Sequence, residues 1–487
     1  MDLINSERSS PFYSQNDHAS GESQENTLTQ KQERLNHIER EMEHLVEMKS
    51  RNHATRLPNE VLSRVFILIA QDHGFVDFPI RKENIPPQLA LSHVCSYWRS
   101  VAFRTSELWS NTSLQYSPNR NIIRIHQRWL LRAGTFPVTL SIQFDKSLDG
   151  NKIADALRSI LPPLEVKRLY LDLTFQKFME LSTISETTFS GLMELELELA
   201  LCQAEVNIEI QDPHHLLTQL RSVSFYSDEG CDLDLWLHKL SPSLPWSQLR
   251  AMDVNVTPSD LRIIINILRQ MPTLKSLSLV VHLNSGLEEL SLPSLLDFSL
   301  EIQIGTDTIG RMEVDEILRS FTCPCLTKFT LTSDRAGWTR KTFGILTQHY
   351  NMQNLQEVEF LGGFALALSI SSILRNAPML RSLSVRRNGI LDDQAIAGIS
   401  DGTLGRCLQT LKISAGSDLG EVLDMVAARK KKVDEMIKNG CGWKEEITLL
   451  KEIDLVNDSD FKLKCDDEKL WALEEAGITV SQYDANV

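Results

Sequence analysis

A short apolar motif recurs along most of the chain after residue 114. It has the form L-x-x-L-x-L, with other apolar residues allowed at the three fixed positions. Most successive starts lie 21 to 31 residues apart, which is the spacing of a strand followed by a return segment. Each motif predicts a short strand whose side chains alternate between two faces. The eleven motifs start at Val166, Leu192, Leu220, Leu249, Leu274, Leu295, Leu326, Leu355, Leu380, Leu408 and Leu450.

Units of this kind cannot bury their apolar side chains alone, so we expect them to stack. The segments starting at Ile267, Ile317 and Ile373 repeat an Ile-Leu-Arg run before the next motif. This pattern resembles leucine-rich repeats, and the resemblance implies a solenoid over residues 114–487. The asparagine expected after the strand occurs only at Asn388, so the repeats are divergent. The alternative is a mixed α/β domain with unrelated leucine-rich strands.

The first 50 residues divide into two parts. Residues 1–27 are polar and poor in large apolar side chains, which predicts a disordered tail. Over residues 28–50 the apolar residues follow helical spacing and predict an amphipathic helix. This helix is either a coiled-coil dimerisation segment or a helix that docks on the next domain. Its apolar positions are Leu28, Leu35, Ile38, Met42 and Leu45.

Two further helices are predicted between residues 57 and 102. Pro58 stands at a helix start, where its missing N–H is not needed. Apolar residues follow at helical spacing in both segments. They are Val61, Leu62, Val65, Phe66 and Ile69 in the first, and Leu91, Val94, Cys95, Trp98, Val101 and Ala102 in the second. Leu108 and Trp109 end a short third element.

Residues 55–113 resemble an F-box, which carries Leu-Pro, an acid, an Ile/Val-Phe pair and Val-Cys-x-x-Trp-Arg. These elements are Leu57-Pro58, Glu60, Val65-Phe66 and Val94 to Arg99. Together with the leucine-rich remainder, they resemble the large F-box families of mushroom-forming fungi. The loop from Gln71 to Gln88 is longer than in a minimal F-box. The alternative is an ordinary helical hairpin.

The resemblance implies a fold and a function. The fold is α/β: a small all-α F-box module followed by a leucine-rich-repeat solenoid, with an N-terminal helix and a helical C-terminal cap. The function is that of a substrate-receptor subunit of an SCF-type ubiquitin ligase. The F-box docks on the Skp adaptor, and through it on a cullin scaffold, while the repeats bind a target protein. The alternative function is a leucine-rich-repeat interaction scaffold without ubiquitin transfer.

The F-box resemblance also implies which residues serve the adaptor contact. One group lies in or just beneath it, and a second group supports it. The first group is Leu57, Pro58, Val61, Leu62, Val65, Phe66 and Trp98, and the second is Val94, Cys95 and Trp109.

Composition narrows the compartment and the partners. The 487 residues are 42% hydrophobic and 24% charged, as in soluble globular proteins. The net charge of −15 argues against a protein that mainly grips nucleic acid or an anionic membrane. The start of the chain lacks the pattern of a signal peptide, and the eight cysteines form no CxxC pair. We therefore expect a cytoplasmic and/or nuclear protein.

The positions that point away from the core predict an acidic surface. In the eleven motifs there are 33 such positions, of which eleven are acidic and four are basic, leaving a charge of −7. This surface predicts a basic target. The alternative, which the sequence supports equally, is that the charges only keep the protein soluble. Glu194, Glu196, Glu198, Glu357 and Glu359 are the candidate target-binding residues. The four bases are Arg168, Lys328, Arg386 and Lys412.

The sequence offers little support for catalysis or metal binding. Gly398 to Gly402 matches Gly-x-Ser-x-Gly, but a helix precedes it where a nucleophile elbow needs a strand. Cys323 and Cys325, and the pair His214-His215, lack further ligands at zinc spacing. Cys95 is expected to be a small buried hydrophobe rather than a nucleophile. We expect no enzyme activity, no cofactor and no metal.

Near the C-terminus, residues 421–437 predict a helix, and residues 467–476 predict a last helix that ends at Gly477. Together these helices could cap the array. The basic run Arg429 to Lys432 is a candidate nuclear localisation patch, but the solvated face of an amphipathic helix is the favoured interpretation.

Overall fold

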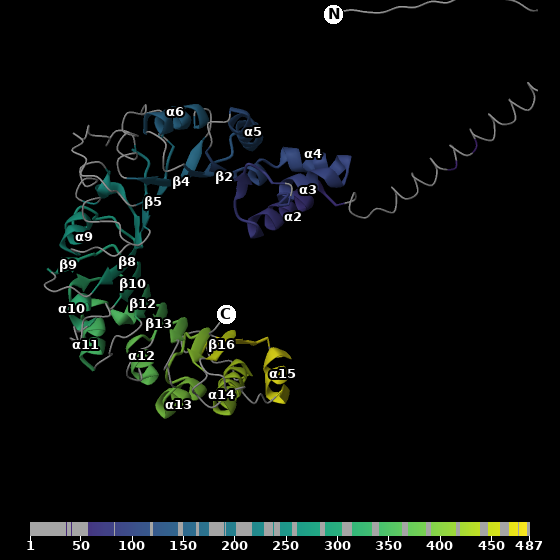
Figure 1. Ribbon diagram of the computed structural model, residues 1–487. Helices are drawn as coiled ribbons and strands as arrows, with labels where there is room; N and C mark the ends of the chain where they lie inside the picture. The colour runs from purple at the N-terminus through teal and green to yellow at the C-terminus, as the bar shows by residue number, and fades with distance from the viewer. Residues whose placement is uncertain are drawn as a thin grey trace, which may run out of the picture. The chain divides into compact units, whose positions relative to one another are not determined.

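Helices and strands alternate along most of the chain in the computed structural model (Figure 1). Contacts group the chain into two units: residues 1–72 with 87–105, and residues 73–86 with 106–487. We call them the helical unit and the sheet unit. The structure describes residues 36, 40, 57–81, 83–116, 120–144, 150–161, 165–174, 189, 191–200, 217–227, 237, 244–255, 261–282, 288–303, 314–333, 340–362, 369–385, 391–414, 419–438, 447–457, 467–475 and 477–484.

The helical unit contains the two predicted helices, the second of them in two pieces. These are α2 (Asn59–Asp72), α3 (Pro87–Val94) and α4 (Ser96–Arg104). The carbonyl of Pro58 accepts the first helical hydrogen bond, 3.0 Å from the nitrogen of Leu62, so α2 begins where the proline predicted. The chain breaks between α3 and α4 at Cys95, whose extended backbone cannot continue a helix.

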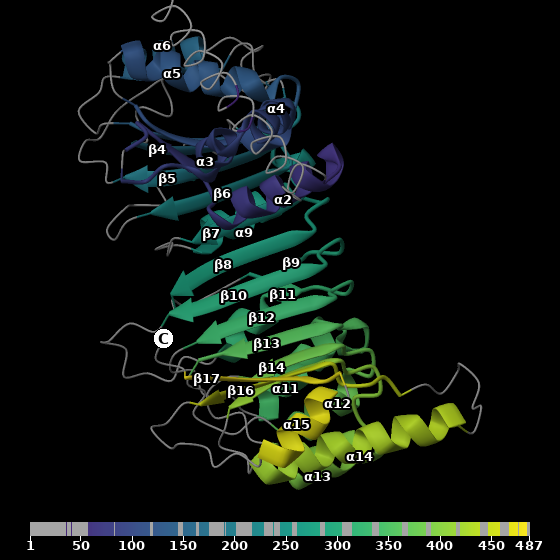
Figure 2. The same cartoon turned by 90° about the vertical axis from the view of Figure 1, so that its right-hand side faces the viewer.

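The sheet unit is built on one large parallel sheet of fifteen strands (Figure 2). Every strand pairs in parallel with its neighbours in chain order, apart from two short strands that pair separately. The fifteen strands are β1 (Val76–Phe78), β2 (Asn111–Gln115), β3 (Val138–Gln143), β4 (Val166–Thr174), β5 (Glu194–Ala200), β6 (Ser222–Ser227), β7 (Ala251–Asn255), β8 (Ser276–His282), β10 (Asp297–Gln303), β12 (Lys328–Ser333), β13 (Glu357–Leu361), β14 (Ser382–Val385), β15 (Thr410–Ser414), β16 (Glu452–Asn457) and β17 (Thr479–Asp484), and the separate pair is β9 (Leu290–Ser291) with β11 (Phe321–Thr322).

All eleven L-x-x-L-x-L motifs coincide with strands of this sheet, from β4 to β16. Ten of the strands begin two residues after the first apolar position, and β4 begins on it at Val166. That first position is buried in every motif. The motif therefore marks both the strand and the residue that anchors its entry to the core.

A ladder of backbone hydrogen bonds joins the strand entries. The amide after the anchoring leucine donates to the equivalent carbonyl of the preceding unit, as from Arg221 to Met193 and from Arg250 to Arg221. The ladder continues through ten such steps to Lys451, with N···O distances of 2.7 to 2.9 Å. Because each step pairs an amide of one unit with a carbonyl of the unit before it, the ladder fixes the register of one unit on the next.

Return helices lie on one face of the sheet, as the positions of α6, α9, α11, α12 and α13 in Figure 1 show. They cover the alternate residues that point into the core, such as Leu195, Leu197 and Phe360. The helices of the sheet unit are α5 (Arg120–Leu130), α6 (Gly150–Ile160), α9 (Leu261–Leu268), α10 (Val314–Arg319), α11 (Arg340–His349), α12 (Ile370–Asn376), α13 (Asp393–Asp401), α14 (Leu419–Lys438) and α15 (Asp467–Glu475), with short 3-10 turns at Ser106–Trp109, Leu131–Ala133, Trp246–Gln248 and Met352–Asn354.

The first strand changes the expected domain boundary. The segment inserted between α2 and α3 forms β1, and Val76 to Phe78 pair in register with Thr112 to Leu114 of β2. Residues 73–86 and 106–113 thus belong to the sheet unit, although 55–113 was expected to be one helical module. The array also begins earlier than the motifs do, since β1, β2 and β3 carry no L-x-x-L-x-L motif.

The expected helical cap is wrong for the described C-terminal part. α14 lies in the chain between β15 and β16, and α15 between β16 and β17, so both are return helices. Gly477 ends the last helix with a φ of 78°, as the sequence predicted. The chain then enters β17, which pairs with β16 and ends the strand order.

Arg429 corrects the interpretation of the basic run on α14 as a solvated face. It is fully buried, whereas Lys431 and Lys432 are exposed. Burial lowers the pKa of its guanidinium to about 10. Five carbonyls accept its hydrogen bonds: Gly405 at 2.7 Å, Thr448 at 3.0 Å, Ile399 at 3.1 Å, Arg406 at 3.2 Å and Leu408 at 3.4 Å.

The first 56 residues lie outside the described part, apart from two positions. Asn36 and Arg40 are helical, and Arg40 Nε donates to the Asn36 carbonyl at 3.1 Å. Their spacing agrees with a helix at these two positions. The tail at 1–27 and the coiled-coil segment at 28–50 remain predictions.

His126 gives the sheet unit an expected sensitivity to acid. Its buried ring packs against Phe78 with a centroid distance of 4.9 Å, and Nε2 lies 3.0 Å from Thr112 Oγ1. Burial lowers the pKa of His126 to about 4. A lowered pKa contributes stability that is present above the unfolded value near 6.5 and is lost as the pH falls toward 4, here roughly 3 kcal/mol.

His126→Gln should flatten this loss of stability between pH 6.5 and 4. Urea unfolding followed by circular dichroism at several pH values measures the effect. His93→Gln, at an exposed position in α3, is the control and should leave the pH profile unchanged. Equal profiles for wild type and His126→Gln would contradict the prediction.

Candidate functional site

One side of α2 carries an apolar stripe that the helical unit does not bury. Val61, Val65, Leu68 and Ile69 are spaced so that they lie on one side of the helix, and Leu57 precedes its first residue by two positions. Each is between 39% and 49% exposed. A single exposed apolar side chain is ordinary, but a continuous stripe marks a surface that a partner covers. The stripe consists of Leu57, Val61, Val65, Leu68 and Ile69.

The opposite side of α2 forms the core of the unit. Leu62 and Phe66 are fully buried. The Phe66 ring packs on Trp98 of α4, with ring centroids 5.1 Å apart and planes tilted by 58°. Helical spacing alone predicts that the apolar residues of α2 form a single face. The structure separates Val61 and Val65, which are exposed, from Leu62 and Phe66, which hold the helices together.

Hydrogen bonds fix the position of the stripe relative to α4. The hydroxyl of Tyr97 donates to the carbonyl of Leu57 at 2.7 Å, which holds the start of α2. The Thr105 hydroxyl donates to Ser63 Oγ at 2.9 Å and joins the end of α4 to α2. The exposed stripe therefore lies on a fixed scaffold.

Cys95 and Trp109 have other roles than expected. Cys95 is the N-cap of α4, where its Sγ accepts from the amide of Trp98 at 3.4 Å, and it is half-buried rather than a core hydrophobe. Trp109 is fully buried in the sheet unit, with its ring centroid 4.7 Å from that of Trp129 and Arg132 stacked on it. It does not belong to the helical unit that carries the stripe.

Four exposed apolar residues of the helical unit differ in whether the sequence identified them as site residues. Val94, which the sequence indicated, is 60% exposed at the end of α3. Leu68, Ile69 and Phe103 were not among the predicted site residues. Helical spacing from Val61 and Val65 was the signal that could have found Leu68 and Ile69.

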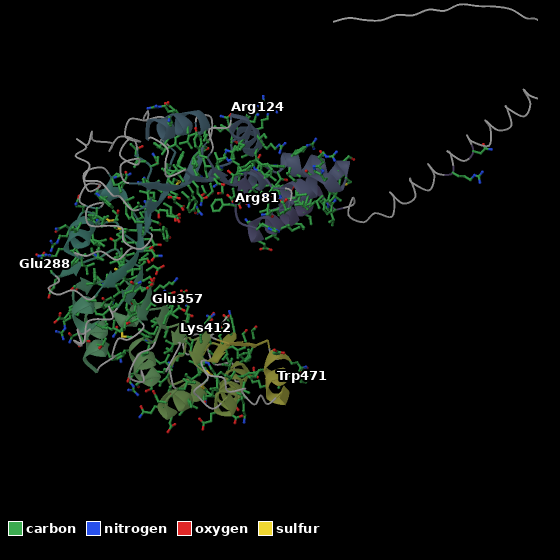
Figure 3. The ribbon with its side chains drawn as sticks, viewed as in Figure 1. Arg81, Arg124, Glu288, Glu357, Lys412 and Trp471 are labelled. Carbon is green, nitrogen blue, oxygen red and sulfur yellow. The ribbon has the colours of Figure 1, made fainter. Side chains whose placement is uncertain are left out.

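The sheet unit presents a second candidate surface on the face away from the helices, which we call the polar face. In Figure 3 the side chains of Glu357 and Lys412 lie on this face, whereas Glu288 lies toward the helices. The candidate target-binding residues Glu194, Glu196, Glu198, Glu357 and Glu359 all occupy it, alternating with buried neighbours on β5 and β13.

The bases on the polar face are paired with acids across neighbouring strands. Arg168 Nε lies 2.8 Å from Glu194 Oε2. Lys328 Nζ stands between Asp297 and Glu357, at 3.8 and 4.0 Å. Lys412 Nζ lies 2.6 Å from Asp454 and 3.6 Å from Glu452. Arg386 is outside the described residues. Since the acids outnumber these bases, the face keeps a negative excess.

The acidic row on β5 is less charged than the sequence suggests. Burial, with the charges of Asp253 and Glu198, raises the pKa of Glu196 to about 7. On the neighbouring strands, the Tyr226 hydroxyl donates to Asp253 Oδ2 at 3.0 Å. Burial, and to a lesser extent the charge of Asp253, raises the pKa of Tyr226. Arg168 forms an ion pair with Glu194, and the pKa of Glu196 is raised, so this row carries less negative charge at neutral pH than three ionised glutamates would.

The described residues of the catalytic and metal motifs lie apart or in ordinary helical structure. Ser400 lies in α13, and its hydroxyl donates to the Ile396 carbonyl at 2.7 Å, as in an ordinary helix. Cys323 is buried while Cys325 is exposed, so the two thiols do not share a site. Within the described residues no group of three or more His, Cys, Asp or Glu could hold a metal. His214 and His215 lie outside them.

No helix among the described residues has the length and apolarity to cross a membrane. The four cysteines that the structure describes are free thiols.

Comparison with known families matches residues 54–115 to the F-box-like family. The match spans α2, β1, α3, α4 and β2 and includes the whole apolar stripe. A search of curated proteins gave no match. The chain thus carries an F-box-like region, and the function of the sheet unit has to be argued from its own residues.

Proposed function

We propose that this protein is a substrate-receptor subunit of an SCF-type ubiquitin ligase. The F-box-like region implies binding to a Skp-type adaptor, and proteins with this region are generally receptors rather than enzymes. The observation that carries the proposal is the exposed apolar stripe on α2, which lies inside the matched region. The adaptor would cover the stripe and connect the chain to a cullin scaffold.

The stripe fits a helix-contacting adaptor surface. Four of its side chains stand on α2, and the stripe runs from Leu57, just before the helix, to Ile69. Amphipathic ridges of this kind dock into apolar grooves through residues spaced by three and four. Because these side chains are already about half buried, a partner that covers one adds roughly half of the 1.5 to 3 kcal/mol of a full burial.

The sheet unit would hold the target protein. We propose that it is a divergent leucine-rich-repeat solenoid, supported by its parallel strands in chain order and by the repeated entry ladder. A doubly wound α/β sheet would instead reverse its strand order. The polar face is the proposed target surface, and its acidic excess favours a basic target.

Two further parts of the proposal concern the setting of the protein. Residues 28–50 would form a coiled-coil helix that pairs two copies or docks on the chain itself. The free thiols fit a reducing compartment, so we propose a cytoplasmic and/or nuclear location.

Affinity purification with the proteasome blocked tests the function. The intact chain should bring down a Skp adaptor, a cullin and ubiquitin-modified targets. Leu57→Ala with Pro58→Ala should retain targets but lose adaptor and cullin. The double variant is preferable to deletion of the whole module, because residues 73–86 supply β1 of the sheet unit. Targets without adaptor on the intact chain would instead support an interaction scaffold without ubiquitin transfer.

A further inference from the structure

Two buried polar atoms on the polar face have no hydrogen-bond partner. They are Oγ of Ser384 on β14 and Oδ1 of Asp454 on β16. Ser384 is 4% exposed and Asp454 is 5% exposed. A buried acceptor without a donor destabilises the folded chain by roughly 1 to 3 kcal/mol, so a group that supplies the donor gains that much in binding.

Strand register brings these atoms to the two sides of one residue. Ser384 pairs with Lys412 of β15, and Lys412 pairs with Asp454. Side chains alternate along a strand. Leu383, Leu411 and Ile453 point into the core, so the row Ser384–Lys412–Asp454 lies on the polar face.

Lys412 satisfies only half of the Asp454 carboxylate. Its Nζ lies 2.6 Å from Oδ2, while Oδ1 is left without a donor. The hydrogen bond to Asp454 raises the pKa of Lys412, so the ammonium group stays charged. The side chains of Lys412 and Glu452, which border the two unpartnered atoms, are 27% and 44% exposed.

The surroundings favour a cationic donor. Glu359 on β13 pairs in register with Ser384, and Glu357 and Glu452 stand two residues earlier on their strands. Glu452 and Asp454 lie 3.6 and 2.6 Å from Lys412 Nζ, and Glu357 lies 4.0 Å from Nζ of Lys328 on β12. On β5, in contrast, Arg168 already pairs with Glu194, and no unpartnered buried atom of β4 to β7 adds to that row among the described residues.

We infer that the Ser384–Lys412–Asp454 row and Glu359 form a subsite that binds an arginine or lysine side chain of the target. This inference rests on the proposed function, in which the sheet unit holds a target protein. The target's cation would donate to Asp454 Oδ1 or to Ser384 Oγ, with Glu359 balancing its charge. The subsite would place target recognition on β13 to β16, and not on β5, where the sequence has more acidic residues.

Fluorescence anisotropy with the full chain tests the subsite. The probe is a labelled peptide in which arginine alternates with glycine and serine, compared with the same peptide carrying glutamate. The arginine peptide should bind and the glutamate peptide should not. Ser384→Ala, which removes a hydroxyl and no charge, and Asp454→Asn should each weaken binding on the order of ten-fold.

Glu301→Gln is the matched control, since it removes one negative charge from the polar face at β10, away from the row. It should change the affinity less than about two-fold at physiological ionic strength. Equal losses for Asp454→Asn and Glu301→Gln, with none for Ser384→Ala, would show general charge attraction and overturn the subsite. So would the absence of binding by the arginine peptide. Thermal unfolding of each variant identifies any loss that comes from misfolding.

Adaptor binding measured on the same preparations separates the two proposals. Variants that keep the adaptor and bind the peptide as wild type does would overturn the subsite alone. Suppose instead that the peptide affinities of wild type and variants are as predicted, but the wild-type chain does not bind the adaptor. This result would overturn the ligase function and leave the subsite standing.

Discussion

Val65→Asp should weaken adaptor binding by at least about a hundred-fold, or roughly 3 kcal/mol. Val65 stands in the middle of the exposed stripe on α2. A carboxylate at this point would be buried without a partner when the adaptor covers the helix. The fold should be unaffected, because Val65 faces away from the Leu62 and Phe66 core. Titration calorimetry with purified Skp adaptor measures the dissociation constant.

Gln71→Asp is the matched control for this prediction. It adds the same charge to the same helix at an exposed position outside the stripe. It should change the affinity less than about three-fold, and the helix by only a few tenths of a kcal/mol. If both variants bind the adaptor as wild type does, the stripe is not the docking surface.

Arg429→Met should lower the free energy of unfolding of the C-terminal repeats by roughly 2 to 4 kcal/mol. The guanidinium gathers five carbonyls from three segments of the chain: the end of α13, the turn at residues 405–408 and Thr448. Methionine fills the volume but supplies no donor, so several buried carbonyls lose a hydrogen bond. The free energy of unfolding of Arg429→Lys should lie between those of wild type and Arg429→Met, because one ammonium group cannot reach all five oxygens.

Hydrogen exchange measures this change where it occurs. Amides in residues 391–414 and 447–457 should exchange faster in Arg429→Met, while those in β4 to β8 should not change, because repeat units contact mainly their neighbours. Lys431→Met, two residues along the same helix and exposed, is the control and should stay within about 0.5 kcal/mol of wild type. Similar exchange in both variants would contradict the structural role of Arg429.

The insertion between the F-box helices has a consequence for experiments on this protein. β1 is formed by residues 76–78, inside the family match at 54–115, yet it belongs to the sheet unit. A truncation that starts after the match would remove β1 and β2 and expose the edge of β3. Unpaired edges promote association between chains, so point substitutions on α2 are the cleaner way to separate the proposed adaptor binding from the proposed target binding.

The sequence alone determined the features that depend on local periodicity. Alternation with a period of two placed all eleven motif strands, and Pro58, Gly477 and the Val-Cys-x-x-Trp-Arg pattern marked a helix start, a helix end and the F-box-like region. Such signals involve residues close together in the chain, where backbone geometry dictates the pattern. The acidic polar face followed from the same alternation.

Only the tertiary structure decided which side of α2 is buried, because both sides are apolar and the choice depends on α4 packing through Trp98. The same holds for Arg429, whose basic neighbours suggested solvent, while its five partners lie 19 to 30 residues away in the chain. Strand β1 and the Ser384–Lys412–Asp454 row depend on pairing between distant segments. The sequence shows each polar residue but not the distant residue that pairs with it, or whether any residue does.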